Sequence, residues 1–215
     1  MKQIQSFITI DFTSKYEMSP DFGDLNDKIS STVLWLSTLS RFDKLSLNLD
    51  FEKNSELKEI SFFAFSESKI KKIDVPDSVD LIDYCAFYKC EKLETINIPK
   101  SINSIDFFTF SFTNLTKIHI PKKVIKISFG SFFKCSNLTT VTFEADSNLV
   151  EIDDFAFSST KIKSISIPKS VKRIGNYSFL NCNYLETVTF DKNTEILTIG
   201  DQCFNGTKID ESQLK

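Results

Sequence analysis

The chain has 215 residues, of which 41% are apolar and 26% are charged, the composition of an ordinary globular protein. Its 29 acidic and 26 basic residues are scattered along the sequence and give a formal net charge of −3, so there is no basic field for nucleic acid or an anionic membrane. The apolar runs, such as residues 33–36, are far shorter than the ~18 residues that a membrane-spanning helix needs. We therefore expect no nucleic-acid partner and no membrane span.

The first eleven residues lack the pattern of a secretory signal peptide. Lys2 is the only basic residue, Asp11 interrupts the apolar stretch, and no small-residue cleavage site follows. Three options stay open: a cytosolic protein, an unconventionally exported one, or a piece of a longer chain.

The next segment has the pattern of an amphipathic helix over about residues 24–42, with Asp24 as N-cap. Its apolar positions recur at spacings of three and four: Leu25, Ile29, Val33, Leu36, Leu39 and Phe42. We expect this helix to cover the first rung of a repeat array, with a partner-binding helix as the alternative. Leu49 and Phe51 match the strand positions of later repeats, which predicts a degenerate first repeat from about Leu45. Residues 1–55 are thus expected to form an N-terminal cap.

From residue 56 onward the sequence repeats every 22 to 25 residues, a period that indicates a solenoid. Each repeat begins with isoleucine: Ile60, Ile82, Ile105, Ile127, Ile152, Ile174 and Ile199. Five residues later stands a phenylalanine: Phe65, Phe87, Phe110, Phe132, Phe157, Phe179 and Phe204. A small residue always precedes it: Ala64, Ala86, Thr109, Ser131, Ala156, Ser178 and Cys203.

The second half of each repeat predicts a short strand with one buried face. Three residues after the phenylalanine comes serine, threonine or cysteine, then an aliphatic residue. A period-two segment follows, such as Ile118 and Ile120 or Val141 and Phe143, and four of these segments end in proline. Residues 56–209 thus form about seven repeats, in which ladders of identical side chains build one core. Residues 210–215 form a polar tail that supplies no strand, so we expect the edge of the last coil to be open. An open edge would fit a truncated chain, a repeat array that continues in a longer parent, or self-association.

The repeat resembles the BspA-like class of leucine-rich repeats, most clearly over residues 174–185. The small residue before phenylalanine, and a cysteine three residues before leucine, distinguish this class from asparagine-ladder repeats. The resemblance implies a β-rich right-handed solenoid of the kind found in surface antigens of bacteria and parasitic protists, with proposed roles in adhesion and in binding host or extracellular-matrix proteins. It therefore implies a cell-surface or secreted protein. The chain departs from secreted members in showing no signal peptide or anchor, so a cytoplasmic location is the alternative.

Catalytic, cofactor and metal sites find little support in the sequence. Cys90, Cys135 and Cys182 share one offset in alternate repeats and should lie about 10 Å apart, too far for disulfides. We interpret them as buried thiols, and Cys203 as a replacement for the small residue of its position. Pairing of Cys85 with Cys90 stays open. His119 is the only histidine and should face solvent without a nucleophile or an orienting acid. We expect no enzyme activity, no cofactor and no metal.

The polar positions between the buried strand residues point outward on one sheet face. This face is the candidate protein-binding site: Lys72, Asp74, Thr95, Asn97, Lys117, His119, Thr140, Thr142, Ser164, Ser166, Thr187 and Thr189. One interpretation is a solvated sheet surface chosen for strand propensity. The other is a broad recognition face of the kind that solenoids provide. The function hypotheses are an adhesin-type protein-recognition module, with an intracellular scaffold or self-assembling structural protein as the alternative, and an enzyme as the least supported.

Overall fold

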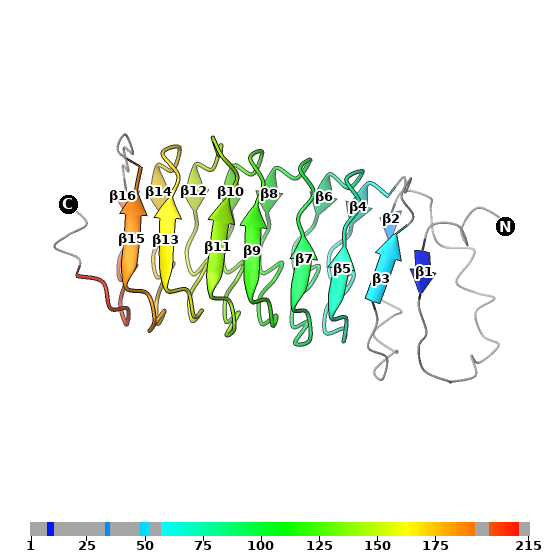
Figure 1. The fold of residues 1–215 in the computed structure, drawn as a ribbon, viewed down its shortest axis with the longest axis horizontal. Helices are drawn as coiled ribbons and strands as arrows, with labels where there is room; N and C mark the ends of the chain where they lie inside the picture. Colours follow the sequence, from blue (N-terminus) through cyan, green and yellow to red (C-terminus); the bar gives the residue numbers. More distant parts are fainter. Residues whose placement is uncertain (1–7, 11–32, 35–47, 52–56, 192–197, 211–215) are drawn as a thin grey trace.

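The computed structural model describes residues 8–10, 33–34, 48–51, 57–191 and 198–210, and it shows a β-solenoid of about six turns (Figure 1). Short strands alternate between two sides of the coil. One side carries β3 (Asn48–Phe51), β5 (Lys72–Asp74), β7 (Thr95–Asn97), β9 (Lys117–Ile120), β11 (Thr140–Phe143), β13 (Ser164–Ile167) and β15 (Thr187–Phe190). The other side carries β2 (Val33–Leu34), β4 (Glu59–Ile60), β6 (Leu81–Ile82), β8 (Ser104–Ile105), β10 (Lys126–Ile127), β12 (Glu151–Ile152), β14 (Arg173–Ile174) and β16 (Thr198–Ile199).

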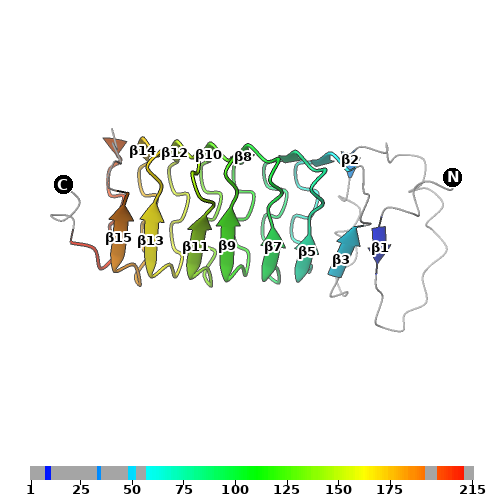
Figure 2. The same cartoon turned by 45° about the horizontal axis from the view of Figure 1, so that its top comes forward.

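Equivalent strands of successive coils pair in parallel with their repeat positions aligned. On the even-numbered side, Ile105 pairs with Ile127 and Ile127 with Ile152. On the odd-numbered side, β9 pairs with β11 and β13 with β15. No ladder joins β7 to β9 or β11 to β13, so the odd-numbered side is interrupted twice although its strands stay in one row (Figure 2). The predicted register of the repeats is therefore confirmed.

The repeated phenylalanines form one continuous column of stacked rings inside the coil. Neighbouring ring centroids lie 5.0 to 5.5 Å apart, with interplanar angles of 16° or less. These rings, which we call the interior column, are at most 4% exposed. These distances are slightly larger than the ~4.8 Å between paired strands in a sheet, so the ring stack follows the backbone ladder from coil to coil. The predicted shared core is confirmed.

The arc around each interior phenylalanine links its coil to the next through alternate backbone N–H groups. The N–H of Phe87 donates to the Thr109 carbonyl at 2.9 Å, and that of Phe110 donates to the Ser131 carbonyl at 2.8 Å. The intervening N–H groups close turns within the coil, as Ala86 does onto Asp83. This alternation requires a left-handed backbone two residues before and after the ring, so residues as bulky as Phe108 and Phe112 have φ values of 51° and 59°.

The cysteines of alternate coils also bridge neighbouring coils. The thiol of Cys135 donates to the Phe110 carbonyl at 3.0 Å and lies 3.2 Å from the Thr113 hydroxyl. Cys90 and Cys182 make the same contacts with the preceding coil. All five cysteines are free thiols. The interpretation of Cys90, Cys135 and Cys182 as buried thiols is confirmed, and the Cys85–Cys90 pairing is wrong.

Two residues of the expected N-terminal helix form a strand. Val33 and Leu34 lie inside the predicted helix but form β2, which pairs with β4 and places Leu34 beside Ile60. A β-branched residue with a ready strand partner is well suited to this ladder. A helix therefore does not run through residues 33–34, and the rest of the predicted helix lies outside the described residues. Leu49 pairs with Ile73, as expected for the strand of a degenerate first repeat. The free edge of β3 is covered by an antiparallel strand, β1 (Ile8–Ile10).

Candidate functional site

The structure places the predicted binding residues together on the outer surface of β5, β7, β9, β11, β13 and β15, which we call the odd-strand face. Eleven of the twelve are exposed, and Thr95 is half-buried. The alternation between buried and exposed residues explains this placement, since Ile118 and Ile120 point inward on either side of His119. The residues share one surface, as the repeat pattern predicts.

Local contacts organise part of this face. Lys72 and Asp74 form an ion pair of 2.7 Å, and His119 Nδ1 lies 3.0 Å from the Thr142 hydroxyl. Asn97 accepts a hydrogen bond from the Val75 N–H at 2.7 Å and donates to the Val75 carbonyl at 2.9 Å. The side chain of Asn97 therefore continues the ladder beyond β5, a structural role that the sequence did not reveal.

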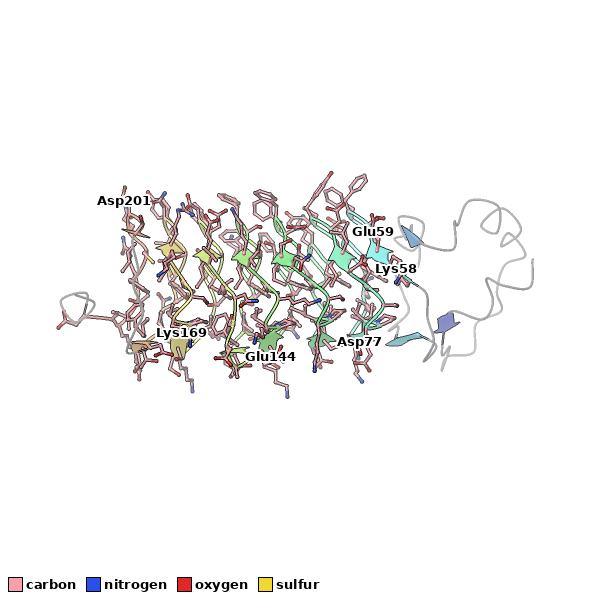
Figure 3. All side chains as sticks on the ribbon, turned by 90° about the horizontal axis from the view of Figure 1, so that it is seen from above. Lys58, Glu59, Asp77, Glu144, Lys169 and Asp201 are labelled. Atoms are coloured by element: carbon pink, nitrogen blue, oxygen red, sulfur yellow. The ribbon has the colours of Figure 1, made fainter. Side chains whose placement is uncertain are left out.

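A pocket of about 370 Å³ opens where the ladder between β11 and β13 is missing. Two predicted site residues, Thr142 and Ser166, contribute to its wall. Its charged lining comes from Glu144, Asp146, Lys169 and Asp191. Figure 3 shows Glu144 and Lys169 along the same long side as Asp77, opposite the side that carries Glu59 and Asp201. The volume lies within the range of small-ligand pockets, and the charges give its rim an acidic balance.

The sequence contains one signal for this pocket. At the exit of β11 the chain reads Phe143 and Glu144, whereas three neighbouring strands exit through proline. The 25-residue repeat therefore turns with a longer loop, in which Asp146 adopts a φ of 53°. The length of the repeat alone predicts a wider turn. It does not predict the pocket between β11 and β13, because the extra residues could equally form a bulge elsewhere in the coil.

A second surface, which the sequence interpretation missed, consists of aromatic rings on the outside of the arcs. Its seven half-buried members form an unbroken chain of ring contacts, and we call them the aromatic strip: Tyr88, Phe108, Phe112, Phe129, Phe133, Phe155 and Tyr177. Two rows of contacts diverge at Tyr88 and rejoin at Phe155. The excess of phenylalanine was the available signal, since only seven of the chain's 22 belong to the interior column.

Lysines and one glycine fit closely around these rings. Lys134 Nζ lies 5.4 Å from the Phe112 ring centroid and 5.3 Å from that of Phe133, and Lys89 lies 5.3 Å from that of Tyr88. Gly130 has a φ of 61°, and a Cβ added there would come within 2.6 Å of Phe108 Cε1. Glycine at this position therefore leaves the space that the Phe108 ring occupies.

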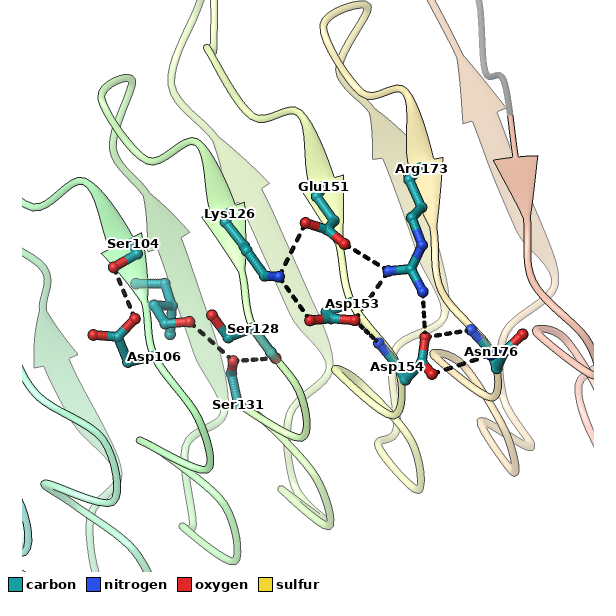
Figure 4. A network of polar contacts seen from close by, with 11 residues as sticks. Ser104, Asp106, Lys126, Ser128, Ser131, Glu151, Asp153, Asp154, Arg173 and Asn176 are labelled. Atoms are coloured by element: carbon teal, nitrogen blue, oxygen red, sulfur yellow. Dashed lines mark hydrogen bonds and ion pairs between the residues drawn. The ribbon is translucent and has the colours of Figure 1, made fainter.

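A polar network joins three coils on the even-numbered side (Figure 4). Lys126 Nζ contacts Glu151 at 3.0 Å and Asp153 at 2.9 Å, and Arg173 contacts the same two carboxylates at 2.6 and 2.9 Å. Arg173 also donates to Asp154 at 2.7 Å. Partial burial opposes ionisation of Asp153, but hydrogen bonds from Lys126, the Asp154 N–H and Arg173 outweigh it and hold its pKa below the ordinary value. Each charged side chain of this network has an oppositely charged partner within it, so we interpret the network as a structural feature that links the coils.

Six copies of the BspA type leucine-rich repeat region match the sequence, over residues 40–138 and 104–215. Together with the stacked coils, this match decides the family. The chain belongs to the BspA-type leucine-rich repeat family. BspA-type solenoids are protein-interaction modules, and proteins of this repeat family and fold are typically not enzymes.

Solved structures show the same BspA-type architecture. The pneumococcal vaccine antigen PcpA superposes with a TM-score of 0.59 at 25% sequence identity, covering 64% of this chain and 37% of that one. A leucine-rich repeat protein from Bacteroides ovatus ATCC 8483 superposes with a TM-score of 0.54 at 25% identity, covering 70% of this chain and 50% of that one. The chain thus spans half the length of these relatives or less. No curated protein matches it.

The remaining candidate chemistry of this BspA-type chain is sparse within the described residues. His119 is exposed, as predicted, and its recorded side-chain contact is with Thr142. No group of three or more histidine, cysteine or acidic side chains in the described ranges is arranged to hold a metal ion. None of the described segments forms a helix of the length and apolarity needed to cross a bilayer.

Proposed function

We propose that this chain is an adhesin-type module, located at a cell surface or secreted, that binds a host or extracellular-matrix protein through the odd-strand face. The observation that carries the proposal is the exposure of eleven of the twelve predicted residues on one side of consecutive coils. Such a face lets many modest contacts add up across repeats. The similarity to a pneumococcal vaccine antigen supports the surface location.

The two halves of this face offer different chemistry to a partner. Lys117 and His119 on β9 carry exposed nitrogen groups, whereas β11, β13 and β15 present only hydroxyls at the corresponding positions. The pocket beside Thr142 and Ser166 can receive a single inserted side chain. A partner that spans both halves would place a polar anchor in the pocket and acidic groups near β9.

The test is binding of the purified chain to immobilised fibronectin and laminin by surface plasmon resonance. We expect the combined replacement Lys72→Ser, Lys117→Ser and His119→Ser to weaken binding about tenfold or more, because contacts on two coils are lost together. Ser166→Trp, which places a large ring beside the pocket, should weaken it independently.

The matched control is the pair Lys58→Ser and Lys123→Ser, which removes an equal number of lysine charges from exposed positions outside the odd-strand face. Binding should survive this change. Equal loss in both variants would indicate a nonspecific charge effect and contradict the proposed site, and absence of binding to either matrix protein would count against the matrix-adhesin role.

A further inference from the structure

The aromatic strip is an apolar surface that lies outside the interior core and is not required to fill it. The interior column already fills each coil, and its rings are at most 4% exposed. Outside it, the seven rings of the strip stay half-buried, and Phe107 beside them is 51% exposed. In Figure 3, rings project beyond the ribbon along the long side that carries Glu59 and Asp201. Contiguous apolar surface of this kind marks a contact site in soluble proteins.

The strip has edges of opposite charge. Along one edge, on the side of the even-numbered strands, Asp83 and Asp106 come before the aromatic positions of two successive arcs, and Ser128 stands at the same position in the next arc. Along the other edge two of the arcs carry a lysine after the aromatic positions, Lys89 and Lys134. Lys89 forms an exposed ion pair of 3.4 Å with Glu67 of the preceding coil. Lys134 makes contacts with two rings but forms no ion pair with any residue in the described ranges. Asp106 accepts a hydrogen bond from Ser104 and likewise lacks an ion pair there.

The opposite charges of the two edges indicate which kind of partner fits the strip. A uniformly acidic or basic partner would match one edge and be repelled by the other. A second copy of the strip carries both edges. If two strips face each other across a two-fold axis parallel to the solenoid, the lysine edge of each copy lies against the acidic edge of the other. A two-fold axis across the solenoid would instead set like charges together.

We propose that the aromatic strip is the interface of a two-fold dimer in which two solenoids lie side by side, coils running in the same direction. Each coil then faces its own copy, so Lys89 of one chain meets Asp83 of the other. The interface is isologous, the commonest arrangement for homodimers. It lies on a different side of the solenoid from the odd-strand face, so both faces can be occupied at once.

The test is sedimentation equilibrium of the full chain over a hundredfold range of concentration. We expect a mass that rises with concentration from 24.6 kDa toward twice that value. Phe112→Ser combined with Phe133→Ser should weaken dimerisation at least about tenfold, with circular dichroism verifying the fold. A monomer at every concentration, or a dimer unaffected by this variant, would overturn the proposal.

Charge reversal tests the orientation without touching the rings. Lys89→Glu and Asp83→Lys should each weaken the dimer severalfold, because each sets like charges opposite one another. The double variant should recover most of the wild-type affinity, since the exchanged charges again meet across the axis. Losses that simply add in the double variant would overturn the parallel arrangement. Failure of matrix binding by the odd-strand face would leave all of these outcomes unchanged.

Discussion

Phenylalanine has two environments in this chain, and one position in the repeat decides between them. Phe110 lies in the interior column at 0% exposure, and Phe112, two residues later, belongs to the half-buried strip. The left-handed backbone at Phe112 turns its side chain out of the coil. Composition shows that phenylalanine is abundant, but only the backbone conformation shows which rings remain available to a partner.

Cysteine shows the same dependence on position, and its reactivity is a residue-scale prediction. Burial raises the pKa of Cys90 and Cys135 to about 12, which outweighs the hydrogen bonds from Ser68 and Thr113. Because the thiolate is the reactive form, we expect Ellman's reagent at pH 8 to modify at most the half-buried Cys85 in the folded chain, and all five thiols after denaturation. The absorbance at saturation gives the number of modified thiols. Cys85→Ser is the control, because it removes the one thiol that should react in the folded chain. Native labelling at Cys90 or Cys135 would contradict the described core.

At the scale of elements, the polar network ties β10, β12 and β14 together beyond their short ladders. Each of these strands has two residues and pairs with its neighbours through both. Lys126 and Arg173 extend that contact from the two flanking coils to the carboxylates of the central one. Partly buried, multiply bonded charges of this kind contribute more than isolated surface pairs.

The network makes stability depend on pH. A carboxylate whose pKa is lowered on folding contributes stability above its unfolded value of about 3.9, and that contribution is lost as the pH falls through the folded value. We expect Asp153→Asn to lower the free energy of unfolding by about 1 to 3 kcal/mol at pH 7, and by much less near pH 3. Urea denaturation across this range measures the difference, with exposed Asp77→Asn as the control. An equal loss at both pH values would exclude the charged network as its cause.

The sequence predicted the elements that repeat and missed those that depend on neighbours. The interior column, the odd-strand face and the buried thiols follow from fixed offsets, since every coil gives the same side chain the same surroundings. The network does not, because the residue before each isoleucine varies and only stacking shows that Lys126 reaches Glu151. The helical period around Val33 was misleading because pairing with β4 outweighed a local pattern. The strip was missed because its members occupy several repeat positions.

At the scale of the whole molecule, the solenoid presents different chemistry on different sides. The odd-strand face is polar and suits distributed recognition, and the aromatic strip suits close packing against a second copy. Both surfaces depend on coils held at a constant pitch, because a shift between coils would separate Thr142 from Ser166 and break the chain of ring contacts. The shared interior is therefore the claim on which both proposed interfaces rest.

A double-mutant cycle on the interior column measures that claim most directly. Phe110 and Phe132 are adjacent in the column, with ring centroids 5.4 Å apart. Phe87 and Phe157 are not in contact, because the rings of Phe110 and Phe132 lie between them. We predict that Phe110→Leu and Phe132→Leu show a coupling of about 0.5 to 1.5 kcal/mol in unfolding free energy. Phe87→Leu and Phe157→Leu should add to within about 0.5 kcal/mol. Additive losses at the adjacent pair, with coupling at the separated pair, would contradict a continuous stack of coils.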